Sequence, residues 1–375
     1  MAKLLRAGVI GAGNMGRNHA RLYAEMDDVE LVAVADPDQG ATAKMAQRYR
    51  VRTYTDYHTM LDREQLDLVS VVVPTEHHFT VTHDVLMAGV PTLIEKPIAA
   101  TMEEGAALVA LAQEREVMLT VGHVERFNPA IIALKTQLEL GTLGKVYQIH
   151  VRRIGPFPTR IKDVGVVIDL ATHDLDIMHY LTGSRVTRLH AEVGQRLHTA
   201  HEDLLSAVLR FQNDIIGVLD INWLTPTKVR ELSVIGERGM FVANYLTQDL
   251  IFYENEAAPD PRDGDWHALA VLGVSEGRMI RFNIHKREPL HEELDAFAAA
   301  VRTGGPAPVR GEDGLLALTI ASRLIESGMT GQTLMVDGER EFGWPHARLQ
   351  VIPASGAVAA PIEMAGRVQF PHGEA

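Results

Sequence analysis

The 375-residue sequence contains no cysteine. Without thiols it can form neither disulfides nor thiolate zinc sites, and no thiol can act as a nucleophile. It also lacks an apolar run of 18 residues and an apolar segment behind Met1, so we expect no membrane span and no signal peptide, and predict a cytoplasmic protein. Any catalysis must therefore use oxygen and nitrogen groups or a cofactor.

The sequence also contains fewer basic than acidic residues. There are 36 Lys and Arg residues against 49 Asp and Glu residues, which gives a formal net charge of -13. This excess disfavours nucleic acid and anionic membranes as partners and favours an enzyme with a small-molecule substrate. An anionic substrate would require a local cluster of basic residues. The chain is longer than one ordinary hydrophobic core requires, so we expect two domains.

The glycine-rich segment 11–16 is the first motif that carries chemistry, and it reads Gly11, Ala12, Gly13, Asn14, Met15 and Gly16. It follows an apolar run at 4–10 and opens a helical pattern, which is the strand-turn-helix context of a dinucleotide-binding motif. Gly11 permits the tight turn, Gly13 lets the backbone approach the pyrophosphate, and Gly16 allows close helix packing. The amino end of the helix, with Asn14 and Met15, would then face the phosphates. The alternative is a glycine turn in another α/β domain.

Asp36 indicates which dinucleotide is bound. It ends a second apolar run, at 30–35, twenty residues after Gly16. A carboxylate at this position accepts hydrogen bonds from the adenosine ribose and repels a 2'-phosphate. Because Pro37 and Asp38 follow, no arginine is present there to bind that phosphate. The sequence therefore predicts NAD rather than NADP as the cofactor.

Strand-like and helix-like patterns alternate as far as residue 122. We expect strands at 51–54, 68–73, 92–94 and 117–122 and helices at 39–49, 79–88 and 101–116. This alternation predicts a doubly wound parallel sheet, a Rossmann domain of residues 1–122 that binds NAD. The strand at 92–94 ends in Glu95 and Lys96, at the edge where such sheets bind ligands. The alternative is a surface ion pair that ends an edge strand.

Residues 123–344 form the expected second domain. Asn128 is a good N-cap and is followed by proline, so a helix should run to about residue 140. Arg126 is either a solvated charge or a ligand contact. Strand-like runs, joined by short polar turns, predict an antiparallel sheet and lie at 145–153, 187–193, 204–211, 215–223, 231–236 and 239–245. The candidates for the substrate side are Asn128, Arg153, Trp223 and Lys228, and ordinary strand, turn and cap positions are the alternative.

Asp169 and His173 are four residues apart, which on a helix places both side chains on one face. A histidine on such a helix is often only a structural residue. A metal site is disfavoured because nothing nearby completes a set of ligands. A helix near 311–328 closes the recognisable pattern, and we find no motif in the tail at 345–375.

These motifs together resemble the Gfo/Idh/MocA oxidoreductases. The residues that carry the resemblance are Gly11, Gly13, Gly16, Asp36, Pro74, His78, Glu95, Lys96 and Pro97, joined by Asp169 and His173. The resemblance implies a Rossmann domain followed by an α/β domain with a large open antiparallel sheet, paired between subunits in a homo-dimer or homo-tetramer. It also implies that Pro74, Thr75, His78 and Glu95 lie beside the nicotinamide half of NAD and that the Lys96-Pro97 bond is cis.

The resemblance makes Lys96, Asp169 and His173 the catalytic residues. Oxidation of a secondary alcohol needs a base within hydrogen-bond reach of the hydroxyl, and either Lys96 or His173 can supply it. The run from Gly122 to Pro129 is similar to that of UDP-N-acetylglucosamine 3-dehydrogenases within the family. We therefore expect oxidation of the 3-hydroxyl of a UDP-N-acetylhexosamine. The alternatives are a free-sugar or inositol dehydrogenase and a non-catalytic regulator that binds a dinucleotide.

Overall fold

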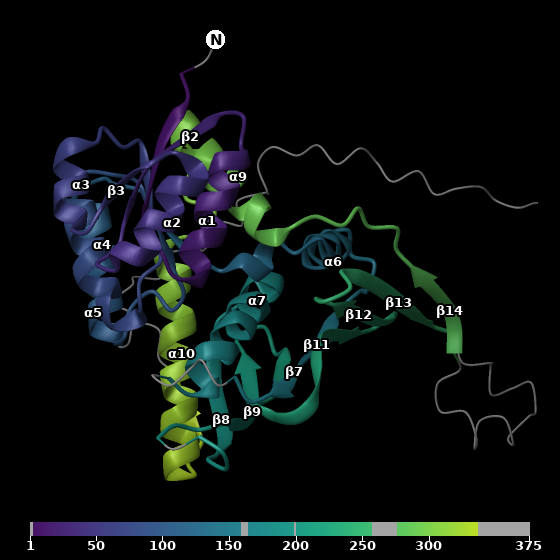
Figure 1. The fold of residues 1–375 in the computed structure, drawn as a ribbon. Helices are drawn as coiled ribbons and strands as arrows, with labels where there is room; N and C mark the ends of the chain where they lie inside the picture. Colours follow the sequence, from purple (N-terminus) through teal and green to yellow (C-terminus); the bar gives the residue numbers. More distant parts are fainter. Residues whose placement is uncertain (1–2, 159–163, 199, 257–275, 337–375) are drawn as a thin grey trace, which may run out of the picture.

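The computed structural model describes residues 3–158, 164–198, 200–256 and 276–336. The predicted tail at 345–375 lies outside the described residues. Figure 1 shows two α/β halves, each built on one sheet.

The first half is a parallel sheet of six strands in the order β3-β2-β1-β4-β5-β6. Its strands are β1 (Leu5–Ile10), β2 (Val29–Ala35), β3 (Arg52–Tyr54), β4 (Leu68–Val71), β5 (Thr92–Glu95) and β6 (Leu119–Gly122). The strand order reverses between β1 and β4, and ligands bind at the carboxyl ends of strands beside such a switch point. The predicted doubly wound sheet is confirmed.

Five helices connect these strands. They are α1 (Asn14–Glu25), α2 (Gln39–Tyr49), α3 (Tyr57–Arg63), α4 (His78–Met87) and α5 (Met102–Glu114), with the short η1 (Thr75–His77) before α4. Side-chain caps define several starts. The Asp38 carboxylate accepts a 2.8 Å hydrogen bond from the Gly40 amide at α2, and Thr101 and Glu104 form the capping box of α5. The sequence pattern had not predicted α3.

The second half contains a nine-stranded sheet in the order β14-β13-β12-β11-β7-β10-β9-β8-β15. The strands are β7 (Val146–Pro156), β8 (Val186–Gly194), β9 (Leu204–Phe211), β10 (Ile216–Asn222), β11 (Leu224–Gly236), β12 (Gly239–Asn244), β13 (Asp249–Asn255), β14 (Glu276–Arg281) and β15 (Leu334–Met335). One feature departs from the predicted antiparallel order. β10 pairs with β7 in parallel, because β7 enters the sheet before the β8-β9-β10 meander and takes a central position. The sheet is therefore mixed.

Further helical segments follow β6 along the chain. They are η2 (Val124–Phe127), α6 (Pro129–Glu139), η3 (Val167–Ala171), α7 (Thr172–Thr182), α9 (Pro289–Thr303) and α10 (Gly311–Thr330). The helix α10 runs from beside α5 to beside β8 (Figure 1). Leu294 and Phe297 of α9 are buried in one cluster with Leu22 and Tyr23 of α1. The core of the NAD-binding half therefore includes residues far beyond 122.

Among the described residues, no helix has both the length and the apolar character needed to cross a membrane.

Candidate active site

The turn between β1 and α1 requires its glycines for two different reasons. Gly11 has a φ of 107°, and a Cβ on it would collide with the Val72 carbonyl. A Cβ on Gly16 would collide with the Gly11 carbonyl. Gly13, in contrast, has open space around it, and it begins α1 without a side-chain cap. The first amide groups of α1 are therefore accessible to an anion such as a pyrophosphate.

Asp36 lies beside this turn. One carboxylate oxygen accepts a 2.6 Å hydrogen bond from the Ala12 amide, and the other accepts one of 2.8 Å from the Asp38 amide. Each oxygen keeps a second lone pair for a ribose hydroxyl. The predicted NAD residues Gly11, Gly13, Asn14, Met15, Gly16 and Asp36 thus share one region, and their chemistry fits the dinucleotide.

Strand β5 delivers Glu95 and Lys96 to the same edge of the sheet. His19 of α1 is fully buried, and its Nε2 lies 3.1 Å from a Glu95 carboxylate oxygen. Burial by itself would raise the pKa of Glu95, but the His19 contact and the Lys96 charge lower it below its usual value. The Lys96-Pro97 bond is cis, as the resemblance implied. Sequence reasoning missed His19, whose only signal was a histidine within the apolar pattern of α1.

Lys96 joins the two halves of the molecule. Its Nζ donates a 2.9 Å hydrogen bond to the Asp169 carboxylate and one of 2.7 Å to the Asp169 carbonyl. Asp169 lies in η3, which is a π-helix rather than the regular α-helix expected from the sequence. Wide turns of this kind are frequent at functional sites because they change where a carbonyl points. The contact brings two of the three predicted catalytic residues together.

His173 lies in the first turn of α7, four residues after Asp169. Its Nδ1 is buried, with no hydrogen-bond partner among the described residues. Burial lowers the pKa of His173 well below its usual value, and the Lys96 charge lowers it further. The ring is therefore neutral at neutral pH, which is the form that can accept a proton.

Pro74, Thr75 and His78 follow β4 beside this region. Pro74 begins η1, which contains Thr75, and His78 is buried at the start of α4. The His78 ring nitrogens lie 2.7 Å from the Pro97 carbonyl and 3.0 Å from the Val73 carbonyl. His78 therefore holds the segments after β4 and β5 together. Contact with the nicotinamide stays a prediction for all three residues.

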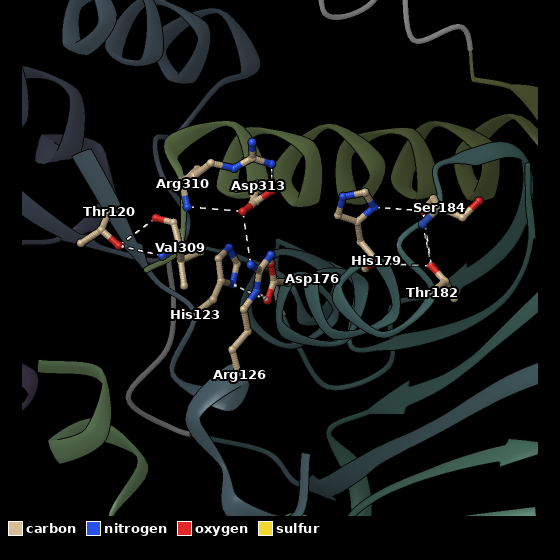
Figure 2. Close-up of polar contacts among 10 residues, drawn as sticks. All are labelled: Thr120, His123, Arg126, Asp176, His179, Thr182, Ser184, Val309, Arg310 and Asp313. Carbon is tan, nitrogen blue, oxygen red and sulfur yellow. Dashed lines mark hydrogen bonds and ion pairs between the residues drawn. The ribbon is translucent and has the colours of Figure 1, made fainter. Parts of the chain in front are cut away.

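Arg126 lies inside a cluster of charges between η2, α7 and α10. It donates hydrogen bonds of 2.8 and 2.6 Å to Asp176 and one of 3.2 Å to Asp313. Figure 2 shows the guanidinium between these two carboxylates, with Arg310 also contacting Asp313. Such a buried network holds three elements in position. The predicted contact between Arg126 and the substrate remains untested.

Arg153 of β7 is also paired with two carboxylates. It donates hydrogen bonds of 2.6 and 2.9 Å to Asp174 and one of 3.1 Å to Glu125. Its guanidinium also lies over the Tyr245 ring, 5.0 Å from the centroid. Asn128 is buried, where its carboxamide oxygen accepts a hydrogen bond from the Ala130 amide and caps α6.

The other two substrate candidates lie farther along the sheet. Trp223 is buried, and its ring packs in one cluster with the rings of Phe157 and His198. Lys228 is exposed on β11. Within the part of the chain that the structure describes, no group of three or more His, Cys, Asp or Glu residues could hold a metal ion.

A Rossmann sheet with this glycine turn, Asp36 and a lysine-carboxylate-imidazole group beside it define an NAD-binding oxidoreductase. Comparison with known proteins agrees. Residues 5–123 match the oxidoreductase family with an NAD-binding Rossmann fold, and residues 131–242 match the GFO/IDH/MocA C-terminal domain. The chain belongs to the GFO/IDH/MocA family.

Individual relatives cover nearly the whole of this fold. The chain is 30% identical over 317 residues to the UDP-N-acetylglucosamine 3-dehydrogenase of Acidithiobacillus ferrooxidans, covering 84% of this chain and 95% of that one. It is 26% identical to the myo-inositol 2-dehydrogenase of Thermotoga maritima, with 84% and 94% covered. A crystal structure of the Acidithiobacillus enzyme superposes with a TM-score of 0.76 at 29% identity, covering 87% of this chain and 98% of that one. Its membership of this family of dehydrogenases identifies the chain as an NAD-dependent oxidoreductase that acts on CH-OH groups.

Proposed function

We propose that this protein oxidises the 3-hydroxyl of the sugar ring in a UDP-N-acetylhexosamine and transfers the hydride to NAD. The observation that carries the proposal is the contact between Lys96 and Asp169 across the two halves, with the neutral ring of His173 one helical turn away. The similarity to a UDP-N-acetylglucosamine 3-dehydrogenase supports the choice of substrate.

The chemistry assigns a separate task to each residue. The glycine turn and Asp36 would hold NAD, which would supply the acceptor for the hydride of the ring carbon. The hydroxyl proton must leave at the same time, and the neutral imidazole of His173 can accept it. The Lys96 ammonium stabilises the negative charge that develops on the oxygen, and Asp169 fixes the position of that ammonium. Lys96 is the second candidate for the proton acceptor.

Two other functions are compatible with this fold. The similarity to a myo-inositol 2-dehydrogenase favours a cyclitol or a free sugar as substrate. A regulator that binds NAD without catalysis would share the fold. The presence of Lys96, Asp169 and His173 together speaks against that regulator, because a binding protein needs no base beside the nicotinamide.

The test is to follow the absorbance of NADH while the protein is offered UDP-N-acetylglucosamine, UDP-N-acetylgalactosamine, myo-inositol and glucose. The proposal predicts that kcat/KM is highest for a UDP-sugar. Faster turnover of myo-inositol or glucose would instead support the second function. A protein that binds NAD but oxidises none of these compounds, even over long incubation, would favour the regulator.

We also infer that the protein forms a homo-dimer or homo-tetramer through the outer face of the large sheet. Val208 of β9 is 52% exposed on this face, while its neighbours Ala207 and Leu209 are buried against the helices. A single exposed aliphatic residue is ordinary on a protein surface, so the inference rests on the family resemblance, which implies that this sheet is paired between subunits. Sedimentation of the purified protein measures the assembly directly, and a monomer at micromolar concentration would contradict it.

A further inference from the structure

Arg230 is a basic residue near the candidate catalytic group that the motifs did not single out. It lies on β11 directly opposite Arg153 of β7. Directly opposed residues of an antiparallel pair project from the same face of the sheet. Arg153 reaches Asp174 of α7 from that face, so Arg230 also projects toward the helices that carry Asp169 and His173.

The hydrogen bonds of Arg230 set it apart from the other two arginines of this region. Its Nη1 donates to the carbonyls of Ile154 and Val229, at 2.8 and 2.9 Å. Arg126 and Arg153 each bind two carboxylates, whereas no carboxylate among the described residues lies within ion-pair distance of Arg230. Its remaining N-H groups, on Nε and Nη2, have no hydrogen-bond acceptor in the described part of the chain. The side chain thus presents a half-buried guanidinium with unused donors.

Electrostatics connect this guanidinium to the catalytic group. Burial and the positive charge of Arg153 lower the pKa of Arg230 to about 10, although Asp174, Glu125 and Asp169 act in the opposite direction. The charge of Arg230 is in turn one of those that lower the pKa of His173. Because charge interactions decay with distance, this effect on His173 agrees with the pairing of Arg230 and Arg153, which places Arg230 on the same side of the sheet as the catalytic group.

A glycine leaves space beside Arg230. A Cβ on Gly155 would lie 3.9 Å from Arg230 Nη1 and 3.8 Å from Lys228 Cγ. Two cationic side chains thus flank one residue without a side chain, and Lys228 likewise has no ion pair within the described ranges. Lys228 lies in the stretch between Leu224 and Val229 where β11 separates from β7, and Arg230 follows at the point where the pairing resumes. In a chain of net charge -13, a local excess of positive charge of this kind is unusual.

We propose that Arg230, assisted by Lys228, binds an anionic oxygen group of the substrate beside the reacting sugar ring. This inference rests on the proposed oxidation of a sugar at Lys96 and His173 and adds a specificity residue to it. A half-buried cation without a counter-charge is costly, and a bound anion would offset that cost. The planar fork of a guanidinium suits both a phosphate and a carboxylate, so the group is either the diphosphate of a nucleotide sugar or a carboxylate on the sugar.

The first experiment compares Arg230→Gln with the unmodified enzyme in steady-state kinetics. For an anionic substrate we expect KM to rise about 10- to 100-fold, the usual cost of losing a hydrogen bond to a charged group. The KM for NAD and the kinetics with neutral myo-inositol should change little. Arg230→Lys should recover part of the loss. Arg238→Gln, which removes an exposed arginine from the turn after β11, is the matched control. An unchanged KM for every anionic substrate, or an equal loss with myo-inositol, would overturn the proposal.

A second experiment does not depend on turnover. Calorimetry measures the binding of UDP and of glucuronate to the NAD-loaded protein. If UDP binds the unmodified protein more tightly than glucuronate does, and Arg230→Gln weakens the binding of UDP, the anion is the diphosphate. If glucuronate binds more tightly and the variant weakens its binding, the anion is a carboxylate on the sugar. If the variant binds both compounds as tightly as the unmodified protein does, or if neither compound binds the unmodified protein, Arg230 does not bind an anion. Binding that depends on Arg230 in a protein that oxidises no sugar would instead retain the anion site and reject the proposed reaction.

Discussion

His173 shows how burial can keep an imidazole ring neutral. Its Nδ1 is buried without a partner among the described residues, and Lys96, Arg153 and Arg230 all disfavour the protonated ring. A histidine in this position stays neutral where an exposed histidine would be partly charged. Its ability to accept a proton therefore results from its surroundings and could not be read from the residue type alone.

The pH dependence of turnover tests this role. A base must be unprotonated, and the pKa of His173 is lowered well below 6.5, so kcat/KM should be level through neutral pH and fall only in more acidic solution. The acidic limb should disappear in His173→Ala, together with most of the turnover. Binding of NAD serves as the control, since it should persist. An acidic limb that remains unchanged in His173→Ala would make His173 structural and leave Lys96 as the base.

At the scale of elements, the turn between β1 and α1 offers a pair of variants that separate folding from binding. A methyl group on Gly16 would collide with the Gly11 carbonyl, whereas Gly13 has open space around it. We expect Gly16→Ala to lose about 1–3 kcal/mol of stability and most NAD binding. Gly13→Ala should keep the melting temperature and lose NAD affinity, because its methyl group would point toward the phosphates.

Calorimetric melting and NAD titration of both proteins measure these effects. A Gly16→Ala protein as stable as the parent would show that the turn can relax. If Gly13→Ala binds NAD as tightly as the parent protein, the pyrophosphate does not bind at this turn.

Elements with strong local signals were predictable. The apolar runs and the glycine motif predicted the parallel sheet, and the cap at Asn128 predicted the start of α6. The parallel pairing of β7 with β10 was not predictable, because strand order in a sheet depends on contacts between distant segments. The π-helix η3 at Asp169 was not predictable either, because the Asp169 carbonyl contacts Lys96 of the other half of the molecule.

The candidate site divides in the same way. The family resemblance singled out Lys96, Asp169 and His173, and the structure places Lys96 against Asp169. The sequence gave no indication that Arg126 would pair with Asp176 or that Arg153 would pair with Asp174. Charges of opposite sign distant in sequence pair only once the fold exists, so a solvated arginine and a buried one look alike in the sequence.

For the whole molecule, the charge cluster around Arg126 connects η2 to α7 and α10 (Figure 2). Replacement of Arg126 by Met would leave Asp176 and Asp313 buried without this counter-charge. We expect a loss of about 3–5 kcal/mol in the free energy of unfolding. Denaturant unfolding measures this value, and Arg238→Gln, at an exposed position, should cost far less. A stable Arg126→Met protein with a raised KM for the sugar would instead make Arg126 a substrate contact.

The central claim is that the two halves of the molecule meet in one catalytic group, with Lys96 of the NAD-binding half held by Asp169 of the other. The most direct test is the kcat of Lys96→Met, measured with NAD affinity in the same preparation. Methionine keeps most of the length of the side chain and removes the charge. We predict that kcat falls by about 10²-fold or more while NAD affinity stays close to that of the parent protein. A Lys96→Met enzyme that turns over its sugar at nearly the original rate would contradict the account.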